Sequence, residues 1–277
     1  MSESRSIDTG TEDLLARVED RVAILTMNRP ERRNAMSDPM LAGLAKALAD
    51  VEVANDVGCV VLTGTGGAFC AGGDVKGMAA AGEGGGAAPI SFDERVHRQR
   101  LSHRATSGKI YEMPKPVIAS LPGAAAGAGM SLALACDLRI ASENAILTTA
   151  FARVGFSGDY GGTWFLTRLV GAAKARELYF LSERIDAKEA ERLGLVNWVV
   201  PEAALEERTL ALAKQLASGP TVAYRYIKEN IKRAMTEDLF ECLDLEATHH
   251  LHTGRTEDHR EAAKAFVEKR TPVFKGR

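Results

Sequence analysis

Residues 58–74, with the sequence GCVVLTGTGGAFCAGGD, join a continuous apolar run to a turn of small residues. The apolar run, Gly58–Leu62, is typical of a strand that is buried on both faces. In the turn, Phe69–Asp74, small residues let a ligand approach the main chain, so that free N–H groups can point at it. An isolated turn of this kind is more simply explained as a plain connection from a strand to a helix. The rest of the chain has to decide between the two interpretations.

The alternation of strand and helix patterns around this stretch predicts an α/β fold with crossover connections. Strands are expected at residues 14–19, 22–27, 116–120, 137–141, 145–149 and 196–200, and helices at residues 40–53, 91–111 and 130–135. A run of Ala, Gly and Glu at residues 79–88 is low in complexity and is expected to be mobile. From residue 203 onward the pattern is almost entirely helical. We therefore expect a flexible polar leader at residues 1–12, a mixed core at residues 13–202 and a helical C-terminal region at residues 203–277.

The composition excludes several classes of function. The 277 residues are 45% hydrophobic and 26% charged, with a net charge of -2. This balance predicts a globular core and no positive field that would attract nucleic acid or anionic lipid. The chain has no apolar run of membrane-spanning length and no apolar secretion signal, so we expect a cytoplasmic protein without a membrane partner.

The sequence also lacks the usual motifs of metal, ATP and NAD sites. It contains neither a phosphate-binding loop of the ATPase type nor a G-x-G-x-x-G fingerprint. The histidines His249, His250 and His252 differ in helical phase and have no partner at ligand spacing, so we expect them on a helix surface and expect no metal site. The cysteines Cys59, Cys70, Cys136 and Cys242 are scattered, which favours a reducing compartment.

A second turn of small residues changes the interpretation of the first. Residues 123–129 read GAAAGAG and precede the helix expected at residues 130–135. The first amides of a helix lack intrahelical partners and carry the positive end of its dipole. Two such turns, each after a strand, could each aim one N–H at a single oxygen, which is the arrangement of an oxyanion hole. Such a pair stabilises the enolate of a thioester, with an effect of roughly 10²–10³ in rate for each donor.

Five segments together are similar to the enoyl-CoA hydratase/isomerase, or crotonase, family. They are NRPERRNA at residues 28–35, FCAGGD at 69–74, GAAAGAG at 123–129, Gly161-Gly162-Thr163, and the pattern A-x-x-A-x-x-L-G-L-V at 187–196. The resemblance implies a spiral core of stacked ββα units and a helical C-terminal region that drives assembly of a homotrimer or of a dimer of trimers. It also implies an acyl-CoA substrate and no separate cofactor, because coenzyme A is part of the substrate.

The resemblance assigns roles to residues of both turns. It implies that Gly73 N–H and Ala128 N–H are the oxyanion donors and that the Ala71 main chain faces the adenine. It implies that Arg33 binds the coenzyme A phosphates, a role which the fixed charge and the fork of a guanidinium suit. The remaining residues of the first turn that it places at the substrate are Gly72, Asp74 and Val75.

The chain departs from the pattern of the hydratases of this family, which use two glutamates around one water. The first glutamate position is Ser131, and counting back from Gly161 places Phe151 at the second. A hydroxyl and a phenyl ring do not perform the acid/base work of a carboxylate pair. The sequence therefore argues against water addition by two glutamates.

Asp159 is the strongest remaining acid near the expected site. An aspartate shortly before a helix is most often an N-cap. In the context GDYGGTWFL at residues 158–166, however, it resembles the acid/base of the phenylacetate-pathway isomerases of this family. One acid suits isomerisation, since the same group can remove a proton at one carbon and return it two carbons away. An apolar setting beside Phe156 and Trp164 is expected to raise its pKa.

The favoured interpretation is an enoyl-CoA isomerase in which Asp159 moves the proton while the amides of Gly73 and Ala128 hold the thioester carbonyl. A second interpretation within the family is a hydratase, lyase or synthase that uses Ser131 and Asp159. A third, of another class, is an acyl-CoA-binding protein without catalysis.

Overall fold

The structure is a computed structural model that describes residues 4–74 and 90–277. Within these residues, seven strands form one sheet in the order β1-β2-β3-β4-β6-β8-β11, and four shorter strands form a second sheet in the order β10-β9-β7-β5. The strands of the first sheet are β1 (Arg5–Ser6), β2 (Leu14–Glu19), β3 (Val22–Met27), β4 (Cys59–Gly64), β6 (Val117–Leu121), β8 (Leu138–Ser142) and β11 (Trp198–Val200). Those of the second are β10 (Ile185–Asp186), β9 (Ile146–Thr148), β7 (Ala124–Ala126) and β5 (Ala68–Cys70).

The first sheet is parallel from β3 to β11 and antiparallel at its N-terminal edge. β2 and β3 form a hairpin whose two turn residues, Asp20 and Arg21, have φ angles of 49° and 65°. Positive φ at both positions is what the tight turn between twisted strands requires. The parallel strands are the apolar runs of the sequence, because helices cover both of their faces.

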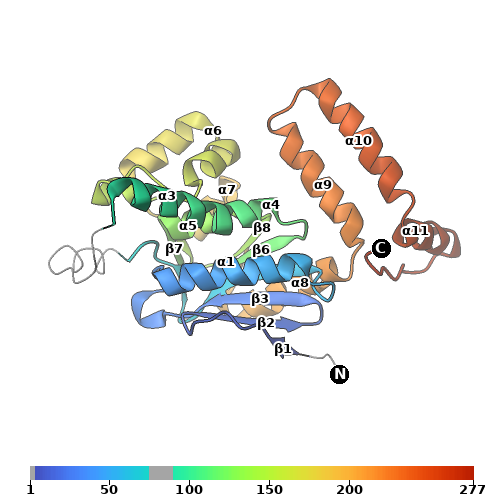
Figure 1. Ribbon diagram of the computed structural model, residues 1–277, viewed down its shortest axis with the longest axis horizontal. Helices are drawn as coiled ribbons and strands as arrows, with labels where there is room; N and C mark the ends of the chain where they lie inside the picture. The colour runs from blue at the N-terminus through green and yellow to red at the C-terminus, as the bar shows by residue number, and fades with distance from the viewer. Residues whose placement is uncertain (1–3, 75–89) are drawn as a thin grey trace.

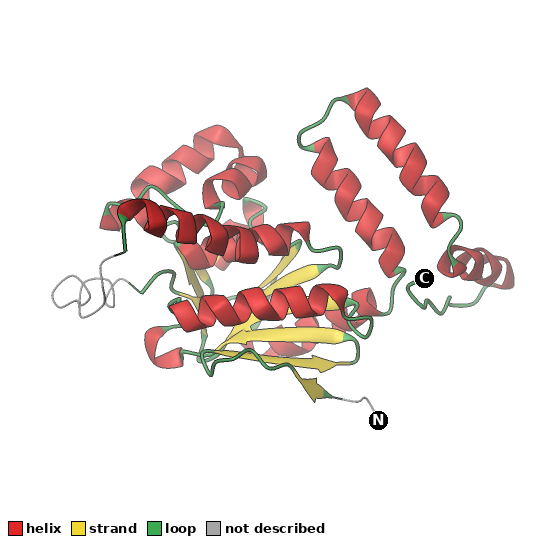
Figure 2. Cartoon of the chain, in the orientation of Figure 1, coloured by secondary structure: helices red, strands yellow, loops and turns green. Residues whose placement is uncertain are grey.

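Helices cover the first sheet in two layers (Figures 1 and 2). One face packs against α1 (Asp38–Val53), and the opposite face packs against α8 (Leu205–Ala217). Alternate side chains of β3 pack on opposite faces of the sheet. Leu25 lies in the core on the α1 side, and Ile24 lies in the core on the α8 side. α1 begins two residues before the expected start at residue 40, because the Ser37 hydroxyl caps it by accepting a hydrogen bond from Met40 N–H at 3.1 Å.

Among the described residues, five further helices and a π-helical turn belong to the mixed core. They are α3 (Phe92–His103), the π-helical turn η2 (Arg104–Gly108), α4 (Lys109–Glu112), α5 (Ala128–Ala135), α6 (Gly162–Leu181) and α7 (Ala187–Arg192). Short 3₁₀ turns lie at η1 (Pro30–Arg32), η3 (Phe151–Val154) and η4 (Glu202–Ala204). The last helices, α9 (Thr221–Ala234), α10 (Leu239–Thr253) and α11 (Glu257–Glu268), project from the mixed core, with α9 and α10 side by side (Figure 1).

The predicted alternation of strands and helices is confirmed, and three features differ from expectation. Arg5–Ser6, inside the expected flexible leader, pairs with β2, and Thr9 is buried, so the leader is held against the sheet from Arg5 onward. Ala124–Ala126 is a strand rather than part of a turn. His249 is buried and bonded to Asn230, so it is not a surface residue. The Gly-rich segment at residues 79–88 lies outside the described residues.

Candidate active site

The two turns of small residues meet because their strands are neighbours. β5 and β7 pair in parallel, with Ala68 opposite Ala124, so both strands end at the same edge of the second sheet. Gly72 follows β5 with a φ of 90°, which favours glycine. A Cβ atom at Gly72 would lie 2.7 Å from the Ala126 carbonyl oxygen and 3.4 Å from Ala128 N. The main chain of the first turn therefore runs directly against the second, and a side chain at Gly72 would separate them.

The amides of both turns are available to a ligand. α5 begins at Ala128, and its first backbone bond within the helix runs from Ser131 N–H to the Gly127 carbonyl. Gly127 offers no side chain to cap the amides before Ser131. Among the residues that the structure describes, no group accepts a hydrogen bond from Gly73 N–H or from Ala128 N–H. Gly129 brings this helix end close to β5, since a Cβ there would lie 2.3 Å from the Cys70 carbonyl oxygen.

The loop at residues 28–36 holds the first turn in place. Ala71 N–H donates to the Arg33 carbonyl at 2.9 Å, and Met36 N–H donates to the Gly72 carbonyl at 2.8 Å. The Arg33 side chain is exposed at this edge of the site. Asp74 forms an ion pair with Arg29 at 3.3 Å, which ties the end of the turn to the same loop. Arg33, Ala71, Gly72 and Asp74, which were expected to bind substrate, therefore lie together at this edge of the site. Val75 lies outside the described residues.

Asp159 lies on the loop before α6, in a setting that disfavours its charge. Its Oδ1 atom is buried, and no described residue forms a hydrogen bond with it. Burial raises the pKa of the Asp159 carboxyl to about 6, in agreement with the expected direction. Phe156, which was expected to contribute to this setting, is 56% exposed. Cys70 and Tyr179 lie close enough for the Asp159 charge to contribute to the raised pKa of each.

Tyr160 anchors the Asp159 loop to α3. Its ring is buried and lies 4.3 Å from the ring of His103, centroid to centroid, and its hydroxyl lies 3.3 Å from Ser102 Oγ. Beside this contact, a cavity of about 260 Å³ opens between α3, η2 and the start of α6. Its walls include His103, Trp164 and Phe165. This cavity is a candidate space for part of a bound acyl chain.

The two positions that would carry glutamates in a hydratase are occupied by groups without acid function. Ser131 is buried one turn into α5, and its hydroxyl donates to the Gly127 carbonyl at 3.3 Å. The start of α6 packs closely on Ser131, since a Cβ at Gly162 would lie 2.2 Å from Ser131 Oγ, so a larger side chain at position 131 would have no room. Phe151 begins η3 and stacks on Tyr179 with a centroid distance of 6.0 Å and an interplanar angle of 3°. Sequence reasoning missed Tyr179, because its position depends on how α6 folds back.

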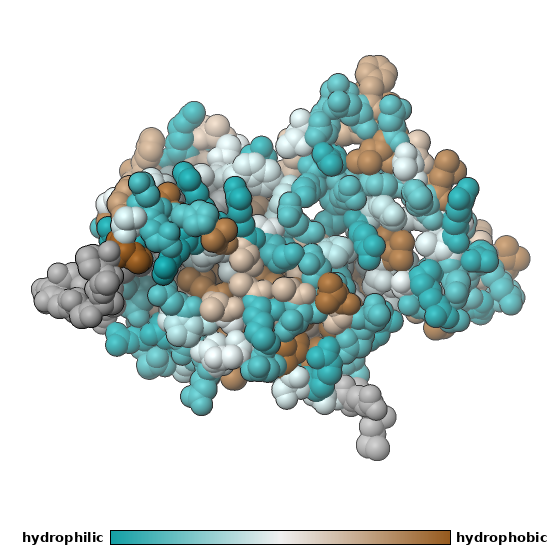
Figure 3. Space-filling model, in the orientation of Figure 1, coloured by the Kyte–Doolittle hydropathy of each residue, from teal (hydrophilic) through white to brown (hydrophobic). Residues whose placement is uncertain are grey.

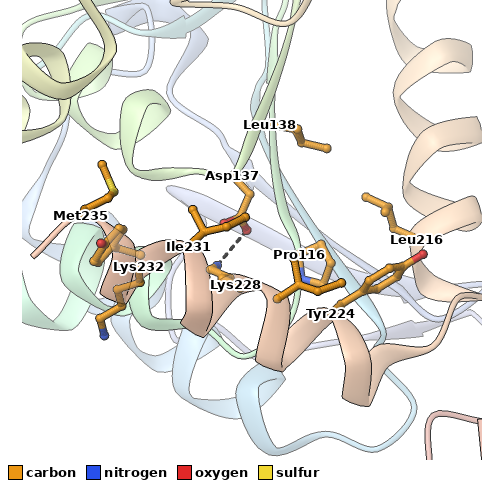
Figure 4. A pocket seen from close by; sticks show the side chains of 11 residues that line it. Pro116, Asp137, Leu138, Leu216, Tyr224, Lys228, Ile231, Lys232 and Met235 are labelled. Carbon is orange, nitrogen blue, oxygen red and sulfur yellow. Dashed lines mark hydrogen bonds and ion pairs between the residues drawn. The ribbon is translucent and has the colours of Figure 1, made fainter. Parts of the chain in front are cut away.

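A different hollow lies under α9, away from both turns. It has a volume of about 310 Å³ and apolar walls that include Pro116, Leu138 and Ile231 (Figure 4). Its acid, Asp137, is paired with Lys228 at 2.7 Å. A partly buried carboxylate that is paired with a lysine fits a structural role better than a catalytic one.

Two findings concern metals and membranes. In the described part of the chain, no group of three or more His, Cys, Asp or Glu side chains could hold a metal ion. No helix within residues 4–74 and 90–277 is long and apolar enough to cross a lipid bilayer.

Comparison with known proteins agrees with this geometry. The profile of the enoyl-CoA hydratase/isomerase family matches residues 17–277. The 1,2-epoxyphenylacetyl-CoA isomerase of Escherichia coli K12 is 39% identical over 266 residues, which cover 96% of this chain and 99% of that protein. The short-chain-enoyl-CoA hydratase of Clostridium acetobutylicum is 34% identical, with 91% and 93% of the two chains covered.

Solved structures place the fold in the same family. The crystal structure of enoyl-CoA hydratase from Bacillus anthracis superposes with a TM-score of 0.87 at 34% identity, covering 96% of this chain and 100% of the other. The expected crotonase fold is therefore confirmed. With its family profile, its relatives and its fold in agreement, the chain belongs to the enoyl-CoA hydratase/isomerase family of enzymes.

Proposed function

We propose that the protein is an enoyl-CoA isomerase that shifts a double bond along an acyl chain, with Asp159 as its single acid/base. The observation that carries this proposal is the isolation of Asp159. It is a half-buried carboxyl with a raised pKa, it lies close enough to Cys70 in the first turn to affect the pKa of that thiol, and no second acid stands at Ser131 or Phe151. The relative from E. coli is named for the isomerisation of a different acyl-CoA, 1,2-epoxyphenylacetyl-CoA, so it supports isomerisation as a reaction type rather than this particular substrate.

The reaction follows from these groups. The amides of Gly73 and Ala128 donate to the thioester oxygen of a 3-enoyl-CoA. The Asp159 carboxylate takes a proton from C2, and the electron pair moves onto the thioester oxygen as a dienolate. The protonated Asp159 then gives this proton to C4, the double bond forms between C2 and C3, and the carbonyl is restored. A carboxyl with a pKa of about 6 suits both steps, since it is neither a very weak base nor a very weak acid near neutral pH.

The first turn and the loop beside it are proposed to bind coenzyme A. The Ala71 main chain lies next to Arg33, whose exposed guanidinium is free to reach phosphate groups at the rim of the site. Gly72 and Asp74 act through the main chain, Gly72 by allowing the close approach of the turns and Asp74 by its ion pair with Arg29.

Isotope exchange in D₂O tests the proposal. The protein is incubated with 2-enoyl and 3-enoyl CoA esters, and double-bond migration, water addition and deuterium uptake are followed separately. We expect double-bond migration with little deuterium uptake, because Asp159 returns the proton that it removes. Activity should fall as the pH drops below about 6, because the base must be ionised to begin the reaction. Asp159→Asn should lower kcat/KM by about 10²–10⁴ and remove that ionisation. Asp50→Asn, which changes an exposed aspartate of α1, is the control.

The same experiment separates the other interpretations. A hydratase or lyase would incorporate water, and Ser131→Ala would then reduce that reaction. A binding protein without catalysis would bind the esters equally well with Asp or Asn at position 159 and would show neither double-bond migration nor deuterium uptake. Either result would contradict the isomerase proposal.

Self-association through the C-terminal helices is also proposed, as a homotrimer or a dimer of trimers. Large apolar side chains are exposed on α9, α10 and α11 and at the C-cap of α9: Ile227, Ile231, Met235, Leu239, Phe240, Leu243, Leu251, Phe266 and Val267. Figure 3 shows brown side chains among the teal ones in the region of α9 and α10. Exposed apolar surface of this extent is typical of an interface. Sedimentation equilibrium should give the mass of three or six chains, and a monomer would contradict the proposal.

A further inference from the structure

Tyr179 reaches the active site because α6 is broken. Gly171 has a φ of 78° and a ψ of 161°, which are not helical, and the chain changes direction there. The second half of the helix thereby brings Tyr179 back to the loop where α6 begins. A Cβ at Gly158 would lie 3.0 Å from Tyr179 Cε1, and a Cβ at Gly162 would lie 2.6 Å from the Tyr179 hydroxyl. The two glycines beside Asp159 therefore leave the space that this side chain fills.

The Tyr179 side chain spans the two positions at which water addition would need carboxylates. Its ring stacks face to face on Phe151. Its hydroxyl comes near Ser131, since the Cβ position of Gly162 that lies 2.6 Å from this hydroxyl also lies 2.2 Å from Ser131 Oγ. One phenol thus occupies the region between Phe151 and Ser131, next to Asp159.

The Tyr179 phenol can fill space beside Asp159 but cannot act as a second base. Burial and the charge of Asp159 raise the pKa of the phenol above its ordinary value, so it stays protonated at any pH near neutral. No group in the described ranges forms a hydrogen bond with its hydroxyl. The ring covers one side of the Asp159 loop, where Oδ1 is buried without a partner.

We propose that Tyr179 is a positioning residue that excludes water from the space between Ser131, Phe151 and Asp159 and thereby selects proton transfer over water addition. A water molecule held there could add to C3 of a 2-enoyl-CoA, whereas in the absence of water the carboxyl only moves a proton between C2 and C4. This inference rests on the proposed function for the reaction, but the exclusion of water from the Asp159 loop can be measured without it.

The first test measures the Asp159 carboxyl directly, in the protein without substrate. The carboxyl is titrated by NMR with ¹³C-labelled aspartate, and its signal is assigned with Asp159→Asn. Removal of the ring in Tyr179→Ala should let water in and lower the pKa of Asp159 toward the ordinary value of about 4. Tyr179→Phe keeps the ring and should leave the titration unchanged. Phe180→Ala removes a neighbouring ring of the same helix that is 74% exposed, and it is the matched control.

The second test measures the outcome of the reaction in ¹⁸O-labelled water. With a 2-enoyl-CoA, Tyr179→Ala should raise the ratio of 3-hydroxyacyl product to isomerised product by about tenfold over the wild type, while Tyr179→Phe should not. If Tyr179→Ala does not fold, as judged by circular dichroism, Tyr179→Leu replaces it in both tests.

An unchanged Asp159 titration in the truncated variant would overturn the inference, and so would an unchanged product ratio in a variant that still isomerises. A wild type that adds water and does not isomerise would overturn the proposed function and the claim of reaction selection. The titration would then still decide whether Tyr179 keeps the Asp159 loop dry.

Discussion

Burial of the Asp159 carboxyl should make the stability of the folded protein depend on pH. The pKa of this carboxyl is raised to about 6, so the folded protein binds the proton more tightly than the unfolded chain, whose aspartate has a pKa of about 3.9. Stability is therefore lost as the pH rises through this window and the carboxylate becomes charged in a partly dry setting.

Asp159→Asn should consequently raise the melting temperature at pH 8, where the gain in the free energy of unfolding is on the order of 1–2 kcal/mol after allowance for partial exposure. At pH 4 the gain should be largely absent, because both side chains are then mostly neutral. Thermal unfolding followed across this pH range checks the prediction. A gain that is equal at both pH values would show that the charge is not its cause.

Gly162 permits the contact between the first turns of α5 and α6. Gly162→Ala would place a Cβ 2.2 Å from Ser131 Oγ and 2.6 Å from the Tyr179 hydroxyl, so the two helices must separate. Overpacking of this kind costs about 1–3 kcal/mol. Urea unfolding should show this loss together with reduced activity. Gly108→Ala is the control, because a Cβ there would meet only the His103 carbonyl, at 3.4 Å, and the variant should be at least as stable as the wild type.

At the scale of elements, Asn34 connects the loop at residues 28–36 to the turn after strand β4 and to the start of β5. It is fully buried, its Oδ1 accepts from Arg29 N–H at 2.8 Å, and its Nδ2 donates to the carbonyls of Thr65 and Ala68 at 2.9 and 2.8 Å. Asn34→Ala leaves these partners unpaired and should cost about 2–4 kcal/mol in urea unfolding. The substitution should also weaken acyl-CoA binding, since Ala71 N–H donates a hydrogen bond to Arg33 of the same loop.

Asn144→Ala is the matched control for Asn34→Ala. It removes one exposed hydrogen bond to Glu202 and should change the free energy of unfolding by less than about 0.5 kcal/mol. Equal losses in the two variants would contradict the special role of Asn34.

The elements that could be predicted from the sequence are those whose signals are local. β2 and β3 have the expected bounds because a tight turn and apolar runs define them, and the paired turns were found because only small residues permit their approach. β7 was missed because Ala124–Ala126 has low strand propensity and is held by pairing with β5 and β9. The position of Tyr179 could not be predicted, because it depends on the break in α6 at Gly171. The residues that Tyr179 lies against, Phe151 and Ser131, also belong to other elements.

At the scale of the whole molecule, a partly buried ion pair between Lys228 and Asp137 links the C-terminal helices to the mixed core. Lys228 of α9 donates to Asp137 at 2.7 Å, as the dashed line in Figure 4 shows, and the same carboxylate accepts from Val117 N–H at 2.8 Å. Burial raises the pKa of Asp137, and Lys228 opposes that rise. The lysine therefore allows a carboxylate to stay charged where the apolar hollow under α9 disfavours it.

Lys228→Met should release α9 more than it weakens the core. It leaves Asp137 without its cation, which we expect to cost about 1–3 kcal/mol, less than for a fully buried pair. Amide hydrogen exchange should accelerate in α9 to α11 while β4 and β6 keep their protection. Lys232→Met, one turn further along α9, breaks an exposed pair with Glu112 and should change exchange little. The double variant Lys228→Met/Asp137→Asn should recover part of the protection, because it removes the stranded charge while an amide oxygen can still accept from Val117. If Lys228→Met and Lys232→Met accelerated exchange equally, the attachment of the C-terminal helices would depend on the apolar contacts of α9 rather than on this ion pair.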